Sequence, residues 1–267
     1  IQHGHAASGF VNRYRHKEGH YLTLQWSSIR DPATAKVYAS AQDITERQQL
    51  EQLKREFVST VSHELRTPLT SICGALGLVS SGCLGELPEP VLQMLQLANN
   101  NCQRLTCLIN DLLDIEKLSA GMMQFVMQPE PVLALVEQSV ADNHHYGHQR
   151  AVTLQLSAAA GAEVWHIQID KLRFAQIMAN LISNAVKFSP PQSSVQIRLQ
   201  RQQQRVKVVV QDQGPGIADE FKPLIFQRFS QADSSDARQK GGTGLGLALS
   251  KQLTESMGGC IGFDSVL

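Results

Sequence analysis

The residues best suited to chemistry begin with a histidine inside a helical pattern. His63 and Thr67 are four positions apart and so share one helical face, and Glu64 places a carboxylate beside the histidine. An exposed imidazole can act as a nucleophile, since one ring nitrogen attacks while the other carries a proton that Glu64 can accept. Pro68 should bend the helix just after the histidine. A lone histidine would be an ordinary surface residue, but these neighbours favour a nucleophile.

A second group combines amide and ammonium side chains. Asn180, Asn184 and Lys187 follow one another at spacings of four and three, so they share a face of one helix, and Phe188 comes next. Amide oxygens are hard ligands that suit Mg²⁺, and a lysine at the same edge can hold phosphate charge. A solvated, amide-rich helix face would give the same pattern, so this segment alone does not distinguish a magnesium and phosphate site from an ordinary surface.

A turn follows an apolar strand pattern further on. Asp212 ends that pattern and is followed by Gly214, Gly216 and Ile217. A carboxylate at a strand end can accept the amino hydrogen of adenine, and glycines let the backbone approach the ring closely. The same residues also describe a plain turn.

A glycine-rich loop precedes the last helical pattern. Glycines that open a helix offer free N–H groups and the positive end of the dipole, which suits phosphate. A Walker loop would end in Lys-Ser/Thr and a Rossmann loop would follow a strand, and neither feature occurs here. The residues expected to line this loop are Gly242, Thr243, Gly244, Leu245, Gly246 and Leu247.

The stretch Ser62-His-Glu-Leu-Arg-Thr-Pro-Leu69 resembles the H-box of sensor histidine kinases of two-component systems. The resemblance implies that His63 accepts the γ-phosphoryl group of ATP and that Glu64 assists as acid or base. It also implies that Thr67 orients water when the partner is dephosphorylated.

The asparagine helix, the Asp212 turn, Phe226-Gln-Arg-Phe229 and the glycine-rich loop occur in the order of the Bergerat-type ATP-binding fold, which they resemble. The resemblance implies ATP and Mg²⁺ as cofactors, with Asn184 as metal ligand and Asn180 and Lys187 near the phosphates. It further implies that Asp212 reads adenine and that the glycines close as a lid. The activity implied is that of an ATP-dependent protein-histidine kinase, whose phosphoryl group passes to an aspartate of a response-regulator receiver domain.

The elements that must position these residues divide the chain into four segments. Residues 1–43 alternate in β-like runs and resemble the close of a PAS domain, and residues 44–56 resemble a signalling helix. Residues 57–120 carry apolar residues at spacings of three and four, which predict a helical hairpin broken by the Gly- and Pro-rich run 81–90. One hairpin cannot cover both stripes, so we expect a homodimer with a four-helix bundle. Residues 121–267 predict an α/β sandwich that binds ATP and is cut short at its last strand.

Within the last segment, the strands and helices are expected to alternate, with the helices on one face of the sheet. The predicted strands are 124–127, 152–156, 195–199 and 206–211, and the predicted helices are 131–143, 171–187 and 245–257. The cluster His144-His-Tyr-Gly-His148 lacks an acidic or cysteine partner, so we interpret it as a polar turn rather than a metal site.

Composition narrows the remaining choices. Lys+Arg and Asp+Glu both number 24, which gives no bulk attraction to nucleic acid or to an anionic membrane. No apolar run approaches the roughly 20 residues that cross a bilayer. Five cysteines without a CxxC pair indicate reduced thiols in a cytoplasmic protein. The first residue is not Met, so we expect a fragment whose parent protein can carry a membrane anchor upstream.

Two rival functions would explain some of these motifs but not all of them. An ATP-driven conformational machine related to gyrase or the heat-shock chaperones would use the nucleotide site but has no need of the His63 motif. A non-catalytic dimeric signalling scaffold would keep the fold with a degenerate site. A third alternative is an output dominated by phosphatase activity, which Glu64 and Thr67 permit.

Overall fold

The computed structural model describes residues 7–31, 34, 36–83, 85, 87–231 and 243–266. The chain forms two compact units, whose boundary falls between Thr67 and Pro68. No helix in the described ranges is both long enough and apolar enough to cross a membrane.

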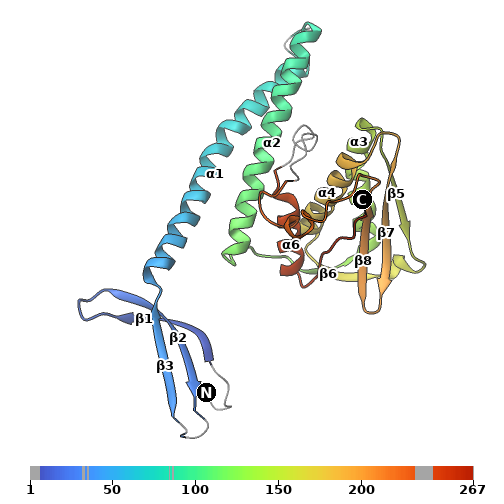
Figure 1. The fold of residues 1–267 in the computed structure, drawn as a ribbon. Coiled ribbons are helices and arrows are strands. Elements are labelled where there is room, and N and C mark those ends of the chain that lie inside the picture. The colour runs from blue at the N-terminus through green and yellow to red at the C-terminus, as the bar shows by residue number, and fades with distance from the viewer. Residues whose placement is uncertain are drawn as a thin grey trace. The chain divides into compact units, whose positions relative to one another are not determined.

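The first unit contains a three-stranded antiparallel sheet and the start of a long helix (Figure 1). The sheet has the order β1 (Ala7–Arg15), β2 (Tyr21–Arg30) and β3 (Val37–Asp43). The first turn of α1 (Thr45–Ser80) is tied to this sheet, because the Thr45 hydroxyl accepts a hydrogen bond from the Thr23 N–H at 2.7 Å and donates to Asp43 Oδ1 at 2.6 Å. The β-rich N-terminal segment is therefore confirmed.

The predicted helical hairpin is also confirmed. α1 continues through Pro68, and α2 (Glu89–Ser119) follows the break. After Pro68, α1 packs against α2 through a small cluster in which Leu69 and Cys102 are buried, and the Cys102 thiol donates to the Leu69 carbonyl oxygen at 3.3 Å. Most of the apolar stripe lies outside this cluster; Phe57, for example, is 68% exposed.

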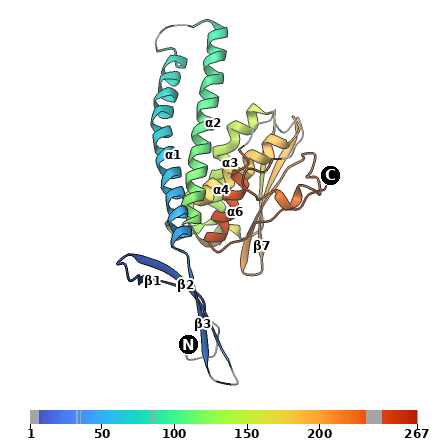
Figure 2. The same ribbon diagram turned by 60° about the vertical axis from the view of Figure 1, so that its left-hand side comes forward.

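The C-terminal segment that the sequence predicts to bind ATP is a mixed α/β domain, as predicted. Strand β7 (Ser194–Gln202) pairs parallel with β5 (Thr153–Ala158) and antiparallel with β8 (Arg205–Gln211). Two helices, α3 (Val132–Gln149) and α4 (Lys171–Phe188), cover one face of this sheet (Figures 1 and 2). The remaining elements are β4 (Gln128–Pro131), β6 (His166–Ile169), α6 (Gly246–Ser256) and the short 3₁₀ helices η1 (Ala162–Val164) and η2 (Lys222–Leu224).

The main buried cluster of this domain lies between its helices and its three-stranded sheet. The apolar side of α4 faces the middle strand β7, and residues of both are almost completely inaccessible to solvent. Asp170 fixes the start of α4, because its carboxylate accepts hydrogen bonds from the N–H groups of Arg173 and Val126 at 3.1 and 2.9 Å. The largest buried members are Val132, Val136, Met178, Ile182, Val186, Val195, Ile197 and Leu199.

Two predicted boundaries in this domain were wrong. The strand predicted at 124–127 is β4, four residues later, where it pairs with β6, a strand that the prediction missed. Pro129 and Pro131 lie in β4, a strand of a short two-stranded ladder, and the helix predicted from residue 131 begins one residue later, at Val132.

The histidine cluster was also misplaced. α3 extends to Gln149, so His144–His148 lies inside the helix and is not a turn after it. Gly147 has a packing role rather than a turn role, since a Cβ added there would meet the Val152 carbonyl oxygen at 2.8 Å. The small residue thus lets the end of α3 approach the start of β5.

Candidate active site

His63 lies on the first unit's part of α1 with its side chain in solvent. The His63 and Glu64 side chains are 75% and 78% exposed, and Nδ1 of His63 is 3.9 Å from Oε1 of Glu64. The Thr67 hydroxyl donates to the His63 carbonyl oxygen at 3.4 Å, one helical turn back. An exposed imidazole with a neighbouring carboxylate is accessible to an incoming phosphoryl group.

The predicted nucleotide residues of α4 share one side of that helix. At one end, Asn180 Nδ2 donates to the Gly246 carbonyl oxygen at 3.3 Å and to Ser250 Oγ at 3.4 Å, so this side chain joins α4 to α6. At the other end, Lys187 Nζ lies 4.7 Å from the centroid of the Phe188 ring. Eight residues of helix separate Asn180 from Phe188, a rise of about 12 Å.

The Asp212 turn lies against the C-terminal end of α4. Asp212 Oδ1 accepts the Gly214 N–H at 2.8 Å, and a Cβ on Gly214 would meet that oxygen at 2.8 Å and the Phe188 carbonyl oxygen at 3.1 Å. Gly216 has a φ of +79°, which L side chains rarely adopt. The Ile217 N–H donates to Ser265 Oγ at 2.9 Å, which attaches the turn to the C-terminal segment. The glycines are therefore required by close approach and by backbone conformation.

The glycine-rich loop is described from Thr243 onward, and Gly242 lies outside the described residues. Gly244 accepts the Phe229 N–H on its carbonyl oxygen at 2.9 Å, a contact called the loop clasp below. A Cβ on Gly244, whose φ is +68°, would meet the Phe229 backbone at 2.8 Å, and one on Gly246 would meet Asn180 Oδ1 at 3.1 Å. Thr243 Oγ1 accepts the Leu245 N–H at 3.1 Å.

Packing limits what the leucines of this loop can contribute. Leu245 is 1% exposed and belongs to a buried cluster with Ile115, Ile177 and Leu249, so only its backbone is available to a ligand. Leu247, in the first turn of α6, is half-buried. The cluster joins α2, α4 and α6, which lie side by side in Figure 2.

Polar contacts across the same junction were not predicted. Arg173 Nη1 donates to Asp114 Oδ2 at 3.1 Å, and Gln176 Nε2 donates to the same oxygen at 3.0 Å. Arg228 Nη2 donates to Ser119 Oγ at 2.6 Å. These partners are 59 or more residues apart in the sequence, and no local pattern marks them.

The residues present fit a magnesium nucleotide. Among the residues that the structure describes, none hydrogen-bonds the side chain of half-buried Asn184, so its amide oxygen is available to a cation. The N-terminus of α6 is suited to phosphate, and it follows Gly244, where a side chain would clash with the Phe229 backbone.

Comparison with known families agrees with this geometry. The His Kinase A (phospho-acceptor) domain matches residues 53–121. The histidine kinase-, DNA gyrase B- and HSP90-like ATPase matches residues 169–266.

Relatives were found among curated proteins and solved structures. The circadian input-output histidine kinase CikA of Synechococcus elongatus is 37% identical over 214 residues, 80% of this chain and 28% of CikA. The signal transduction histidine-protein kinase BarA of Escherichia coli is 33% identical over 223 residues, 82% of this chain and 24% of BarA. The chain thus spans about a quarter of the length of these relatives.

Two solved structures share the fold. Full-length ShkA in complex with AMPPNP superposes with a TM-score of 0.62 at 28% identity, over 76% of this chain and 41% of ShkA. The complex of histidine kinase ThkA with response regulator protein TrrA gives a TM-score of 0.51 at 21% identity, over 94% of this chain and 73% of that chain. With its phospho-acceptor helix and its ATPase domain matched in this order, the chain belongs to the sensor histidine kinases.

Proposed function

We propose that this chain transfers the γ-phosphoryl group of ATP to its own His63. The observation that carries the proposal is the exposed His63–Glu64 pair on a phospho-acceptor helix, in the same chain as an ATPase domain. Catalysis of this kind depends on positioning and on charge stabilisation more than on covalent work by the protein.

The chemical step is an in-line displacement. One imidazole nitrogen of His63 attacks the γ-phosphorus, an N–P bond forms, the bond to the bridging oxygen breaks and ADP leaves. The proton on the other ring nitrogen passes toward Glu64, whose carboxylate is 3.9 Å from Nδ1. Thr67 would orient water in the reverse, dephosphorylating direction.

The nucleotide would bind along one side of α4. Asp212 and the turn through Gly216 and Ile217 would hold adenine, and the backbone around Gly244 and Gly246 would hold the phosphates. Asn184 would ligate Mg²⁺, which neutralises phosphate charge when bound. Lys187 lies at the same edge and would add a positive charge.

The fragment would act as a homodimer in the cytoplasm. Apolar side chains on α1 are exposed in the single chain, and a second copy would bury them in a four-helix bundle. For this fragment we retain the proposed segments: a PAS remnant (1–43), a signalling helix (44–56), a phosphotransfer hairpin (57–120) and an ATP-binding domain (121–267).

The acceptor downstream of His63 would be an aspartate of a response-regulator receiver domain. CikA and BarA are named as histidine kinases, and ThkA was solved with a response regulator protein. A phosphoramidate is a suitable donor because its N–P bond breaks readily as an O–P bond to the carboxylate forms, which leaves the imidazole free again.

Incubation with γ-labelled ATP and Mg²⁺ tests the proposal. We expect label that is stable to base and lost in acid, absent from His63→Gln and retained in His144→Gln, a control at another exposed histidine. Asp212→Asn should lose nucleotide binding, whereas His63→Gln should keep it. Label that survives acid, or that persists in His63→Gln, would overturn the assignment, and nucleotide binding without any label would favour the scaffold alternative.

A further inference from the structure

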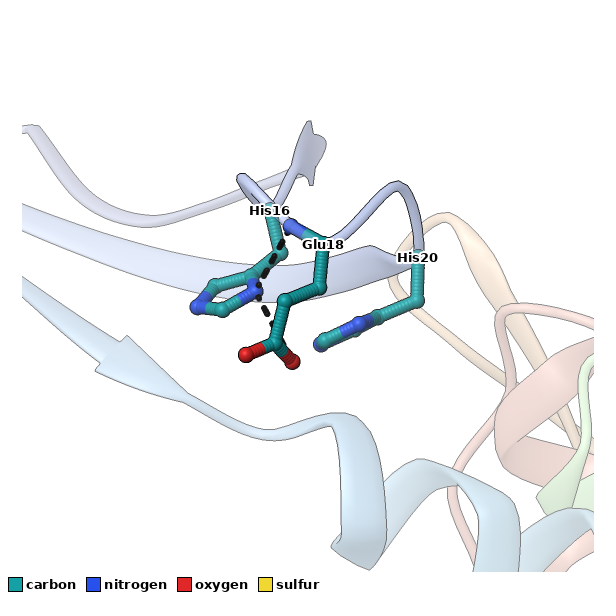
Figure 3. Close-up of side chains that lie close together, drawn as sticks. All are labelled: His16, Glu18 and His20. Carbon is teal, nitrogen blue, oxygen red and sulfur yellow. Dashed lines mark hydrogen bonds and ion pairs between the residues drawn. The ribbon is translucent and has the colours of Figure 1, made fainter.

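The turn between β1 and β2 gathers three side chains that can bind a metal ion. His16, Glu18 and His20 alternate through this turn, which follows the last β1–β2 pair, Arg15 with Tyr21. One ligand atom of each of the three lies within 4.8 Å of the other two (Figure 3). In the described part of the chain, no other group of three or more His, Cys, Asp or Glu has this arrangement.

The backbone fixes the two histidines opposite each other. The His16 N–H donates to the His20 carbonyl oxygen at 2.7 Å, and the Gly19 N–H donates to the His16 carbonyl oxygen at 2.9 Å. Gly19 has a φ of +91°, which closes the turn in a conformation that favours glycine. The imidazole rings consequently stack, with centroids 4.4 Å apart and planes inclined by 26°.

Glu18 supplies the negative charge. Its Oε2 lies 3.7 Å from Nδ1 of His16, and its side chain is 68% exposed. Figure 3 shows the carboxylate reaching toward both imidazoles. Because Glu18 is mostly in solvent, it can rotate without disturbing any packed residue.

The distances between the ligand atoms of the three side chains are close to those in a tetrahedral metal site. Bonds of about 2.1 Å to a tetrahedral ion put neighbouring ligand atoms about 3.4 Å apart. The three ligand atoms, within 4.8 Å of one another, therefore need to approach by about 1.4 Å at most. Rotation of Glu18 and His20, whose side chains are exposed, provides such a movement.

We propose that this turn binds a divalent transition-metal ion of the zinc class through His16, Glu18 and His20. Two imidazoles and one carboxylate favour Zn²⁺, Cu²⁺ or Ni²⁺ over Mg²⁺ and Ca²⁺, which prefer all-oxygen sites. Three protein ligands leave a fourth position for water. The site is independent of the proposed nucleotide and its magnesium.

Zinc titration of the metal-free chain, without nucleotide or Mg²⁺ and in competition with a chromophoric zinc indicator, tests the site. We expect the double variant His16→Ala/His20→Ala to bind one zinc ion fewer, and Glu18→Gln to weaken the same ion by about tenfold or more. The matched control His144→Ala/His148→Ala removes two exposed histidines, one helical turn apart on α3, and should bind zinc as the wild type does.

Unchanged zinc stoichiometry and affinity in His16→Ala/His20→Ala would overturn the proposal, as would an equal loss in the control. The zinc-edge X-ray absorption spectrum of the one-zinc wild-type complex gives a readout that needs no variant. Imidazole scattering without sulfur is expected there. Sulfur ligands would assign the ion to the cysteines and exclude this turn.

Discussion

Within a single chain, α4 and α1 place their apolar side chains in contrasting surroundings. On α4, Ile182 is 0% exposed because it lies in the buried cluster between the helices and the sheet, whereas Phe57 on α1 is 68% exposed. Both helices carry apolar residues at spacings of three and four, so the pattern alone does not separate them. The difference teaches that the ATPase domain holds its own core, while apolar side chains of α1 such as Phe57 stay exposed in the single chain.

The largest effect should come from removing a side chain from the core of the ATPase domain. Ile182→Ala is expected to lower the free energy of unfolding of this domain by about 2 to 5 kcal/mol, through lost burial and a residual cavity. Urea unfolding followed by circular dichroism measures the change. Leu172→Ala is the matched control on the same helix, since Leu172 is 70% exposed and should cost less than about 0.5 kcal/mol.

A smaller effect is expected from the exposed apolar side chains of α1, which the proposed dimer would bury. In a dimer, Phe57→Ala removes two buried rings, and at about 1 kcal/mol for each ring the dimer dissociation constant should rise about 30-fold. Sedimentation over a range of protein concentrations measures this constant.

Ser59→Ala is the control on the same helix, because residue 59 points about 200° away from residue 57. If Phe57→Ala left self-association unchanged while lowering monomer stability, the contrast between α1 and α4 would disappear.

The smallest effect on stability is expected from Asp111, a partly buried carboxylate on α2. Burial raises the pKa of Asp111 to about 6, and the charge of Asp114 adds to the shift. A carboxyl group whose pKa is raised on folding disfavours the folded state once it ionises, so its contribution to stability falls as the pH rises from about 4 to 6.

Asp111→Asn should therefore stabilise the chain at pH 8, by about 1 kcal/mol after allowance for solvent screening, and by less at pH 5. Urea unfolding at the two pH values measures the difference, with Asp264→Asn as a control at an exposed carboxylate. An equal gain in the free energy of unfolding at both pH values would contradict the prediction, because it would mean that Asp111 in the folded chain has the same charge at pH 5 and at pH 8.

The sequence predicted those parts of the fold that depend on local pattern. The bounds of α4 and α6 came within one residue, because an unbroken apolar stripe or a glycine run marks them. The nucleotide residues on α4 were visible because one helix carries all of them. His16, Glu18 and His20 were missed as a group, although their alternate spacing is a local signal that could have found them.

What could not be predicted depends on tertiary contacts. Gly147 reads as a turn but lies in α3, where the Val152 carbonyl oxygen requires a small residue. The Arg173–Asp114 pair joins residues 59 apart, and neither residue is unusual in its own segment. Leu245 belongs to the loop by sequence and to the core by packing.

The loop clasp between Phe229 and Gly244 determines how strongly the length of the intervening chain affects the stability of the domain. The hydrogen bond from the Phe229 N–H to the Gly244 carbonyl oxygen, 2.9 Å long, joins two backbone positions that are 15 residues apart in the sequence. Joining two such positions costs loop-closure entropy, and for a flexible chain doubling the number of residues between them raises that cost by only about 0.6 kcal/mol. A flexible insertion between Phe229 and Gly244 should therefore lower the stability of the folded domain only slightly.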